Sequence, residues 1–519
     1  MDQYPGGGSG TYEVPQGVAP AYVPAPKPKK KPWIWIAAGG GALVVILVLV
    51  LVLTLGGGGN SGKAVVGPMI YTEDGDAFLA VGAQSIPLDD AGYSYSGFLN
   101  AVLLEDGSAM FYMADVSESS GEGDLMRIQL GNAKAEPEVV AEDVYDAEIS
   151  DDGGKILYVT DVEDDAGDLY ICTPGGDPEK VDESVYRFSI SPNGKHAYYT
   201  VVDDDFNETL YLYSGGEPEE VMDIDEEESL GSGYIDDSGR ILFTVDDVEG
   251  SSTLYLYSNG DTEKINKDTS GYLVFDSAVE FLYAKDGTEL YYYNAGEEVR
   301  ITKEFDGIDF PTTANTNEHF DRHFVYEETS SSGKTTLYEF VLPENSTKML
   351  KVDGSYSVDP TFKAIAYSDD GELCLARKSG SSWEDVQDVC DYSPSYRFDE
   401  SGRYLYYISA DDGDYVGDLC RIPATGGEEE VLLEDVTSFL LAGGKVYAIN
   451  EDGEAYLVTN PKDSVKIEED ISSLYEAASG IYLTGFDDEL YYYNGGEAER
   501  ISRDASTIGY SGYIAGGSY

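Results

Sequence analysis

Residues 190–221 read ISPNGKHAYYTVVDDDFNETLYLYSGGEPEEV, and this stretch contains the pattern that recurs through most of the chain. Apolar or aromatic residues alternate with other residues around Tyr199 and again at 210–213, which is the period of a β-strand with one buried face. Gly215 and Gly216 follow the second run, and glycine readily adopts the positive φ angles of a tight hairpin turn. The stretch therefore predicts consecutive antiparallel strands joined by short turns.

The same pattern returns along the chain. The hairpin recurs as LYLYSNGDTEKI at 254–265, LYYYNAGEEVRI at 290–301 and LYYYNGGEAERI at 490–501, and the preceding turn recurs in variants such as IDDSGRILFTV at 235–245. Units of four short strands at intervals of roughly 40 residues are typical of a β-propeller, in which each unit buries its faces against its neighbours. We expect such units to begin near Tyr93, Tyr145, Tyr186, Gly231, Gly271, Asp306, Ser355, Tyr392, Phe439 and Leu474.

A resemblance to a known group rests on the turn Ser191-Pro192-Asn193-Gly194-Lys195 and on the Leu-Tyr strands after it. This pattern resembles the TolB-type, WD-like propeller repeat and the related Tyr-rich propellers of bacterial surface proteins. The resemblance covers roughly residues 64 to 515 in degenerate form, since most units have Asp or Glu in place of the proline. It implies an architecture and a bacterial surface protein, and it brings no catalytic residues.

The two ends of the repeat region are expected to complete one another. Residues 69–88 read as three strands without a partner on one side, and 509–515 offers a lone strand. Together they would form one blade, giving ten to eleven four-stranded blades in an all-β fold. Because a single ring usually has four to eight blades, we expect two propellers, formed by residues 64–310 and 311–519.

An apolar run at 34–55 precedes the repeats, with Lys27, Lys29, Lys30 and Lys31 before it. Its 22 residues would cross a bilayer as a helix, and the lysines favour a cytoplasmic N-terminus. The sequence thus predicts a disordered tail at 1–31, a transmembrane helix at 32–56 and a Gly-rich linker at 57–63. A cleaved signal peptide is the alternative, although its apolar region would be shorter.

Charge restricts the partners of this chain. Its 519 residues hold 99 acidic and 32 basic side chains, for a formal net charge of −67. A nucleic-acid backbone would be repelled, whereas cations and basic proteins would be attracted.

The four cysteines contain no C-x-x-C pair, so structural zinc is not expected. Cys374 and Cys390 flank one turn, so a cross-hairpin disulfide between them is one possibility. We expect instead that both remain free thiols.

Candidate chemistry is weak throughout the sequence. The acidic loops around Asp161 and Asp165, and around Asp203 and Asp205, are weak calcium candidates that lack the order of a calcium-binding loop. We interpret their acidity as solvated surface charge. His319 and His323 have the spacing of a metal-binding histidine pair on a helix. In a strand they would lie about 13 Å apart and could not share one ion. No hydrolase, Walker or dinucleotide motif occurs, so we expect no catalytic residue and no cofactor.

These observations favour a membrane-anchored, extracytoplasmic propeller that binds or scaffolds another protein or an envelope polymer. An extracytoplasmic enzyme acting on glycans is one alternative, and a sensor of an external ligand is another. A convergent pair of carboxylates in a central channel would favour the enzyme. An aromatic patch on one face of the propeller would favour the binding module.

Overall fold

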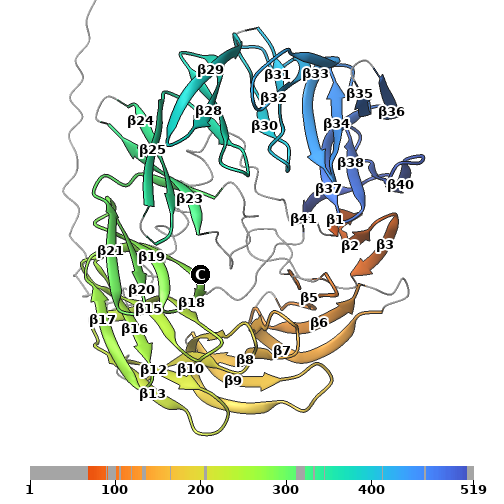
Figure 1. Cartoon of the computed structure of the whole chain (residues 1–519). Coiled ribbons are helices and arrows are strands. Elements are labelled where there is room, and N and C mark those ends of the chain that lie inside the picture. Colours follow the sequence, from red (N-terminus) through yellow and green to blue (C-terminus); the bar gives the residue numbers. More distant parts are fainter. Residues whose placement is uncertain are drawn as a thin grey trace, which may run out of the picture.

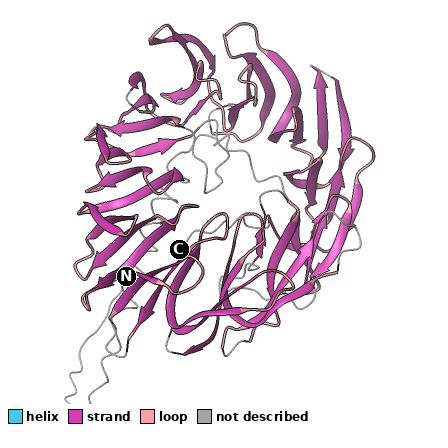
Figure 2. Ribbon diagram, turned by 60° about the horizontal axis from the view of Figure 1, so that its bottom comes forward, coloured by secondary structure: helices cyan, strands magenta, loops and turns pink. Residues whose placement is uncertain are grey.

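The computed structural model describes residues 68–510, apart from 89–90, 92–100, 105–106, 118–119, 131–135, 164, 204–206, 311–321, 331–332, 344, 412 and 461–462. The predicted tail, transmembrane helix and linker lie outside these residues. Every named element of the described chain is a β-strand (Figure 2). Within this part of the chain there is no helix that is long and apolar enough to cross a membrane.

The strands follow one another in antiparallel groups of four, here called blades. The first blades contain β1 (Met69–Glu73), β2 (Asp76–Val81) and β3 (Gln84–Leu88); β4 (Ala101–Leu103), β5 (Ala109–Ala114), β6 (Gly123–Gln129) and β7 (Glu138–Ile149); β8 (Ile156–Glu163), β9 (Ala166–Cys172) and β10 (Glu179–Ile190); β11 (Ala197–Val202), β12 (Glu208–Tyr213) and β13 (Glu219–Ile224); β14 (Glu228–Ile235), β15 (Ile241–Asp247), β16 (Ser252–Ser258) and β17 (Asp261–Asn266); and β18 (Thr269–Ser277), β19 (Glu280–Lys285), β20 (Glu289–Asn294) and β21 (Glu297–Thr302).

The remaining strands repeat this order. They are β22 (Gly307–Asp309), β23 (His323–Thr329), β24 (Thr335–Val341) and β25 (Asn345–Val352); β26 (Tyr356–Val358), β27 (Ala364–Asp369), β28 (Glu372–Ser379) and β29 (Ser382–Cys390); β30 (Tyr396–Phe398), β31 (Tyr404–Ser409), β32 (Gly417–Pro423) and β33 (Glu430–Ala442); β34 (Lys445–Asn450), β35 (Ala455–Asn460) and β36 (Asp463–Glu468); and β37 (Ile471–Ala477), β38 (Gly480–Gly485), β39 (Leu490–Tyr493), β40 (Glu499–Ser502) and β41 (Ser506–Tyr510).

Three long strands, β7, β10 and β33, each belong to two blades. In β7, the part from Glu138 to Val144 pairs with β6, and the part from Val144 to Ile149 pairs with β8. The same arrangement joins β9 to β11 through β10, and β32 to β34 through β33. These shared strands merge neighbouring blades into sheets of ten and seven strands. Elsewhere the blades are separate four-stranded sheets, so the meander predicted from the sequence is confirmed.

In several blades the turn between the first two strands is held by the side chain that begins it. The Ser191 hydroxyl accepts a hydrogen bond from the backbone N–H of His196 at 3.1 Å, and the Asp236 carboxylate accepts one from Arg240 N at 3.1 Å. Serine and aspartate favour such turns because their short polar side chains bond to nearby backbone groups. Gly194 has a φ angle of 66°, a conformation that glycine adopts without strain. The turn thus needs the serine or aspartate and the glycine, whereas the proline is dispensable.

The core lies between neighbouring blades. Leu212 of β12 packs in one cluster with Ile241 and Phe243 of β15 in the next blade. Within a blade, Tyr199 stacks on Tyr211 with ring centroids 5.5 Å apart, and other blades have equivalent cross-strand aromatic pairs. Such pairs stabilise adjacent strands beyond simple burial of area. Most tyrosines of the repeat therefore have a structural role.

The described ends of the chain meet in one blade. β41 pairs antiparallel with β1, with Met69 opposite Tyr510 and Ile70 opposite Gly509, and the sheet order is β3-β2-β1-β41. The closing strand begins at Ser506, slightly before the predicted start at 509. Figure 1 shows the blades around a central opening, with β18, β30 and β41 toward that opening and β3 toward the outside. The chain thus has a propeller-type fold.

The expected division into two propellers at 310/311 does not fit this arrangement. β22 ends at Asp309 and β23 begins at His323, yet the two strands pair in one sheet, so the proposed boundary falls inside a blade. Figure 1 shows one ring, and its first blade takes β41 from the opposite end of the described chain.

Candidate functional site

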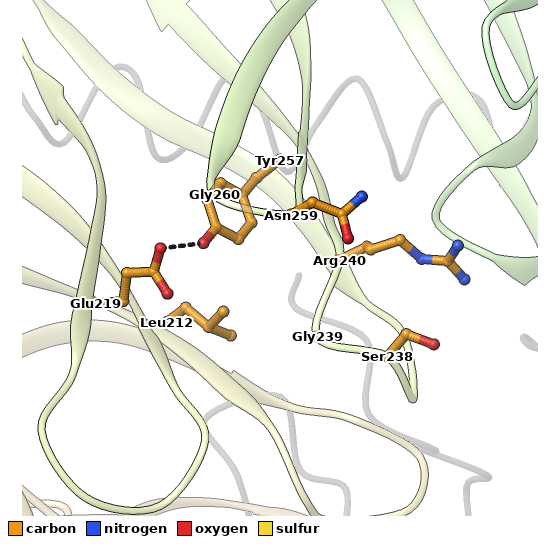
Figure 3. Close-up of a pocket in the computed structure, with 8 residues that line it drawn as sticks. All are labelled: Leu212, Glu219, Ser238, Gly239, Arg240, Tyr257, Asn259 and Gly260. Carbon is orange, nitrogen blue, oxygen red and sulfur yellow. Dashed lines mark hydrogen bonds between the residues drawn. The ribbon is translucent and has the colours of Figure 1, made fainter.

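One candidate site is a pocket between two neighbouring blades, drawn in Figure 3. Its volume is about 550 Å³, within the usual range for ligand pockets. One wall comes from the end of β12 and the start of β13. The other wall comes from the β14–β15 turn, the end of β16 and the β16–β17 turn. The lining side chains include Leu212, Glu219, Ser238, Arg240, Tyr257 and Asn259.

Glu219 and Tyr257 form the centre of this pocket. The Tyr257 hydroxyl donates a hydrogen bond to Glu219 Oε1 at 2.7 Å, which joins the two blades. Burial raises the pKa of Tyr257 to about 12, and the hydrogen bond to Glu219 adds to the effect, so the phenol remains the proton donor. Tyr257 is only 4% exposed, whereas Glu219 is exposed. In Figure 3 the second carboxylate oxygen of Glu219 points into the pocket.

Arg240 also lines the pocket, but its charge is balanced elsewhere. Its guanidinium forms an ion pair with the buried Asp236 at 2.7 Å and donates a hydrogen bond to Ser277 Oγ at 2.8 Å. Figure 3 shows the guanidinium directed away from Glu219. The unbalanced charge in this pocket is therefore the negative charge of Glu219.

The pairing of Glu219 with Tyr257 has an equivalent between the two preceding blades. There the Tyr213 hydroxyl donates to Glu179 Oε1 at 3.3 Å. Glu179 lies opposite Ile171, as Glu219 lies opposite Leu212, so the two acids occupy equivalent positions in consecutive blades. The sequence contained the signal for both pairs, a glutamate after a glycine turn and a tyrosine at or near the end of a strand. Only the structure shows that the partners belong to different blades.

A second pocket has the opposite charge. It has a volume of about 290 Å³ and is lined by Tyr406, Arg421 and Lys445 among others. Arg421 donates to Glu430 at 2.6 Å, and its guanidinium lies 4.9 Å from the ring centre of Tyr404. The negative character of the Glu219 pocket is thus a local property and not one shared by every groove.

A pair of carboxylates occurs where the blade of β22–β25 meets the blade of β26–β29. Asp309 of β22 and Glu327 of β23 lie on the same face of their sheet, because Glu327 is opposite Gly307, two residues before Asp309. The Tyr356 hydroxyl of β26 donates to Glu327 Oε1 at 2.7 Å. Burial raises the pKa of Asp309 to about 7, with the charge of Glu327 as a further cause. Burial also raises the pKa of Glu327.

Glu148 is a second acid with a strongly raised pKa. It lies on the half of β7 that pairs with β8 and accepts a hydrogen bond from the backbone N–H of Ile190 in the next blade at 2.8 Å. Burial raises its pKa to about 8, although the hydrogen bonds from Ile190 and Ser189 oppose the shift. Sequence patterns did not single out Asp309, Glu327 or Glu148, because nothing local distinguishes them among 99 acids.

The weak calcium candidates do not come together in the described chain. Asp161 and Asp165 are exposed near the β8–β9 turn, Asp203 accepts hydrogen bonds from Asn207, and Asp205 lies outside the described residues. Among the residues described, the one group of acids close enough to share an ion is Asp353, Asp369 and Asp370. These acids are exposed, and Lys334 already pairs with Asp353 at 2.6 Å.

The histidine and cysteine candidates have structural surroundings. His323 Nε2 lies 2.9 Å from Glu339, and His319 is outside the described residues. All four cysteines are free thiols, which agrees with the expectation from the sequence. Cys374 packs in the core on one face of its sheet, and Cys390 packs against the core on the other face. A disulfide between them is therefore excluded by the fold.

No known family profile and no curated protein matches the sequence. Solved structures with similar folds include a GH74 enzyme of Niastella koreensis, at 12% identity and a TM-score of 0.31, covering 85% of this chain and 91% of that one. Dipeptidyl peptidase 4 of Porphyromonas gingivalis has 14% identity and a TM-score of 0.39, with 68% and 66% covered. The β-propeller domain of the Trilobed protease from Pyrococcus furiosus has 15% identity and a TM-score of 0.31, with 70% and 98% covered.

These likenesses bear on the fold alone, since all three identities are low. With such TM-scores, the propeller-type fold rests on the strand pairing of this chain. The activities named for these proteins are properties of those proteins.

Proposed function

We propose that the chain is a membrane-anchored propeller that acts as a binding module for a protein or polymer outside the cytoplasm. The proposal includes an anchor at 32–56, a single ring of eleven blades and a distant relation to TolB-type propellers. The observation that carries it is the pocket at the boundary of two blades, where Glu219 of one blade meets Tyr257 of the next, together with the equivalent contact of Glu179 with Tyr213 between the preceding blades. Equivalent contacts at successive blade boundaries suit an extended partner, because linked contacts raise overall affinity.

A retention experiment tests binding against catalysis. Residues 64–519 are immobilised, and the protein and polysaccharide fractions of an envelope extract are applied separately at physiological ionic strength. We expect saturable retention of one fraction, with the retained material recovered at unchanged size. Shortening of the polysaccharide would favour the glycan-active enzyme, and retention of neither fraction would contradict the binding module.

The enzyme alternative has one observation in its favour, the carboxylates of Asp309 and Glu327. Two carboxyl groups with different pKa values can serve as acid and base in glycoside hydrolysis. In this chain, however, Glu327 accepts a hydrogen bond from Tyr356 of the adjacent blade, and that bond gives the glutamate a structural role. If polysaccharide is shortened in the retention experiment, Asp309→Asn would show whether this pair is responsible.

The proposed location has its own test. Protease added to intact cells stripped of their wall should digest the ring and leave a small fragment that contains residues 1–56. The N-terminal tail would then be protected inside the cell, as the lysines before the apolar run predict. Complete protection of the ring under these conditions would contradict an extracytoplasmic location.

A further inference from the structure

We infer that the pocket between β13 and β16 binds a basic side chain, lysine or arginine, of a partner protein. This inference rests on the proposed binding function and identifies the chemistry of the partner at one of the grooves. It begins from the charge of the pocket. Asp236 balances Arg240, so the carboxylate of Glu219 is the charge available to a ligand.

The geometry of Glu219 fits a cationic donor. One carboxylate oxygen is occupied by the Tyr257 hydroxyl, which fixes the orientation of the group. In the described part of the chain the other oxygen has no hydrogen-bond partner, and Figure 3 shows it pointing into the pocket. Charge-assisted hydrogen bonds from a cationic donor to a carboxylate are stronger than hydrogen bonds between neutral groups.

The remaining lining groups suit a peptide. Tyr257 contributes its hydroxyl, which holds the carboxylate in place from a ring that is itself buried. Ser238 and Asn259 bring a hydroxyl and an amide to the pocket, groups that can bond to a peptide backbone. The volume of about 550 Å³ is larger than one side chain needs, so it can also take part of the flanking chain.

Electrostatics over longer range favours the same partner. The net charge of −67 draws basic proteins toward the molecule, and the pocket then gives one basic residue a defined position. The equivalent pair of Glu179 and Tyr213 lies between the two preceding blades. A partner with two spaced basic residues would therefore meet a second carboxylate at the neighbouring blade boundary.

The test uses residues 64–519 and the peptide acetyl-Gly-Gly-Arg-Gly-Gly-amide, with binding followed by saturation-transfer NMR and calorimetry. A citrulline peptide of the same shape is the uncharged control for the ligand. The protein variants are Glu219→Gln and Glu220→Gln. These two lose the same charge from adjacent positions of β13, but their side chains point to opposite faces of the sheet.

We expect the arginine peptide to bind and the citrulline peptide to bind at least tenfold more weakly. Glu219→Gln should weaken arginine binding about tenfold, as expected for the loss of one charged hydrogen bond, and Glu220→Gln should change it less than twofold. Equal losses in the two variants, or equal binding of the two peptides, would overturn the inference. Thermal melting of each variant shows whether it is folded.

The outcome separates this inference from the proposed function. If residues 64–519 retain an envelope fraction but do not bind the arginine peptide, the binding module stands and the basic-residue pocket fails. If the Glu219→Gln protein fails to retain the partner and the Glu220→Gln protein retains it, both the binding module and the basic-residue pocket stand. Retention of a fraction equally by wild type and Glu219→Gln would place its contact elsewhere and overturn the pocket's role in that binding.

Discussion

A chain that ends at Ala505, before β41, is expected to unfold at a lower temperature than the complete ring. β41 is the innermost strand of the blade that also contains β1, and it joins the two ends of the described chain. Its removal breaks the backbone pairing with β1 and the hydrogen bonds between Thr72 and Ser506. At about 1 kcal/mol for each hydrogen bond, we expect a loss of about 3–5 kcal/mol.

In a ring of this size, that loss corresponds to a decrease in Tm of about 3–5 °C, because unfolding entropy grows with chain length. The open edge of β1 should also promote aggregation. The matched control ends at Tyr510 and keeps β41, so calorimetry of the two truncations isolates this strand. Identical melting of the two proteins would show that β41 does not stabilise the ring.

The repeat and its closure were predictable because their signals are local. Alternation along a strand, a turn glycine and, in several repeats, a first serine or aspartate indicate the hairpins. The structure places β14, β18, β26, β30 and β37 within a few residues of the predicted unit starts. The lone strand near the C-terminus was also recognisable, since the strands at 69–88 lacked a partner. These features depend on residues that are close together or on strands that remain unpaired.

The number of rings was not predictable from the sequence. It depends on the angle between neighbouring blades, which arises from packing such as that of Leu212 against Phe243 across two blades. The pairing of Glu219 with Tyr257 also depends on that angle, although both residues belong to visible repeats. Asp309 and Glu327 were harder still, because a long connection separates their strands and their shared face follows from the register.

The raised pKa of Asp309 has a consequence for stability, and its direction follows from proton binding. An unfolded aspartic acid releases its proton near pH 4, whereas the folded chain keeps it until about pH 7. Between these values the folded state binds more protons than the unfolded state, so the free energy of unfolding falls as pH rises. Asp309→Asn removes the ionisation and should therefore stabilise the protein at pH 8 but change it little near pH 4.

We expect a gain of about 1–3 kcal/mol at pH 8, less than the full linkage value because the half-buried carboxyl is partly solvated. Glu148→Gln should behave in the same way over a window that extends to about pH 8, the pKa of that group in the folded chain. Exposed Asp161, replaced by Asn, serves as a control for the loss of one negative charge. Urea unfolding at pH 5, 6, 7 and 8 measures the effect. If Asp309→Asn and Asp161→Asn gave the same pH dependence, net charge and not the pair of Asp309 and Glu327 would govern the loss of stability between pH 4 and pH 7.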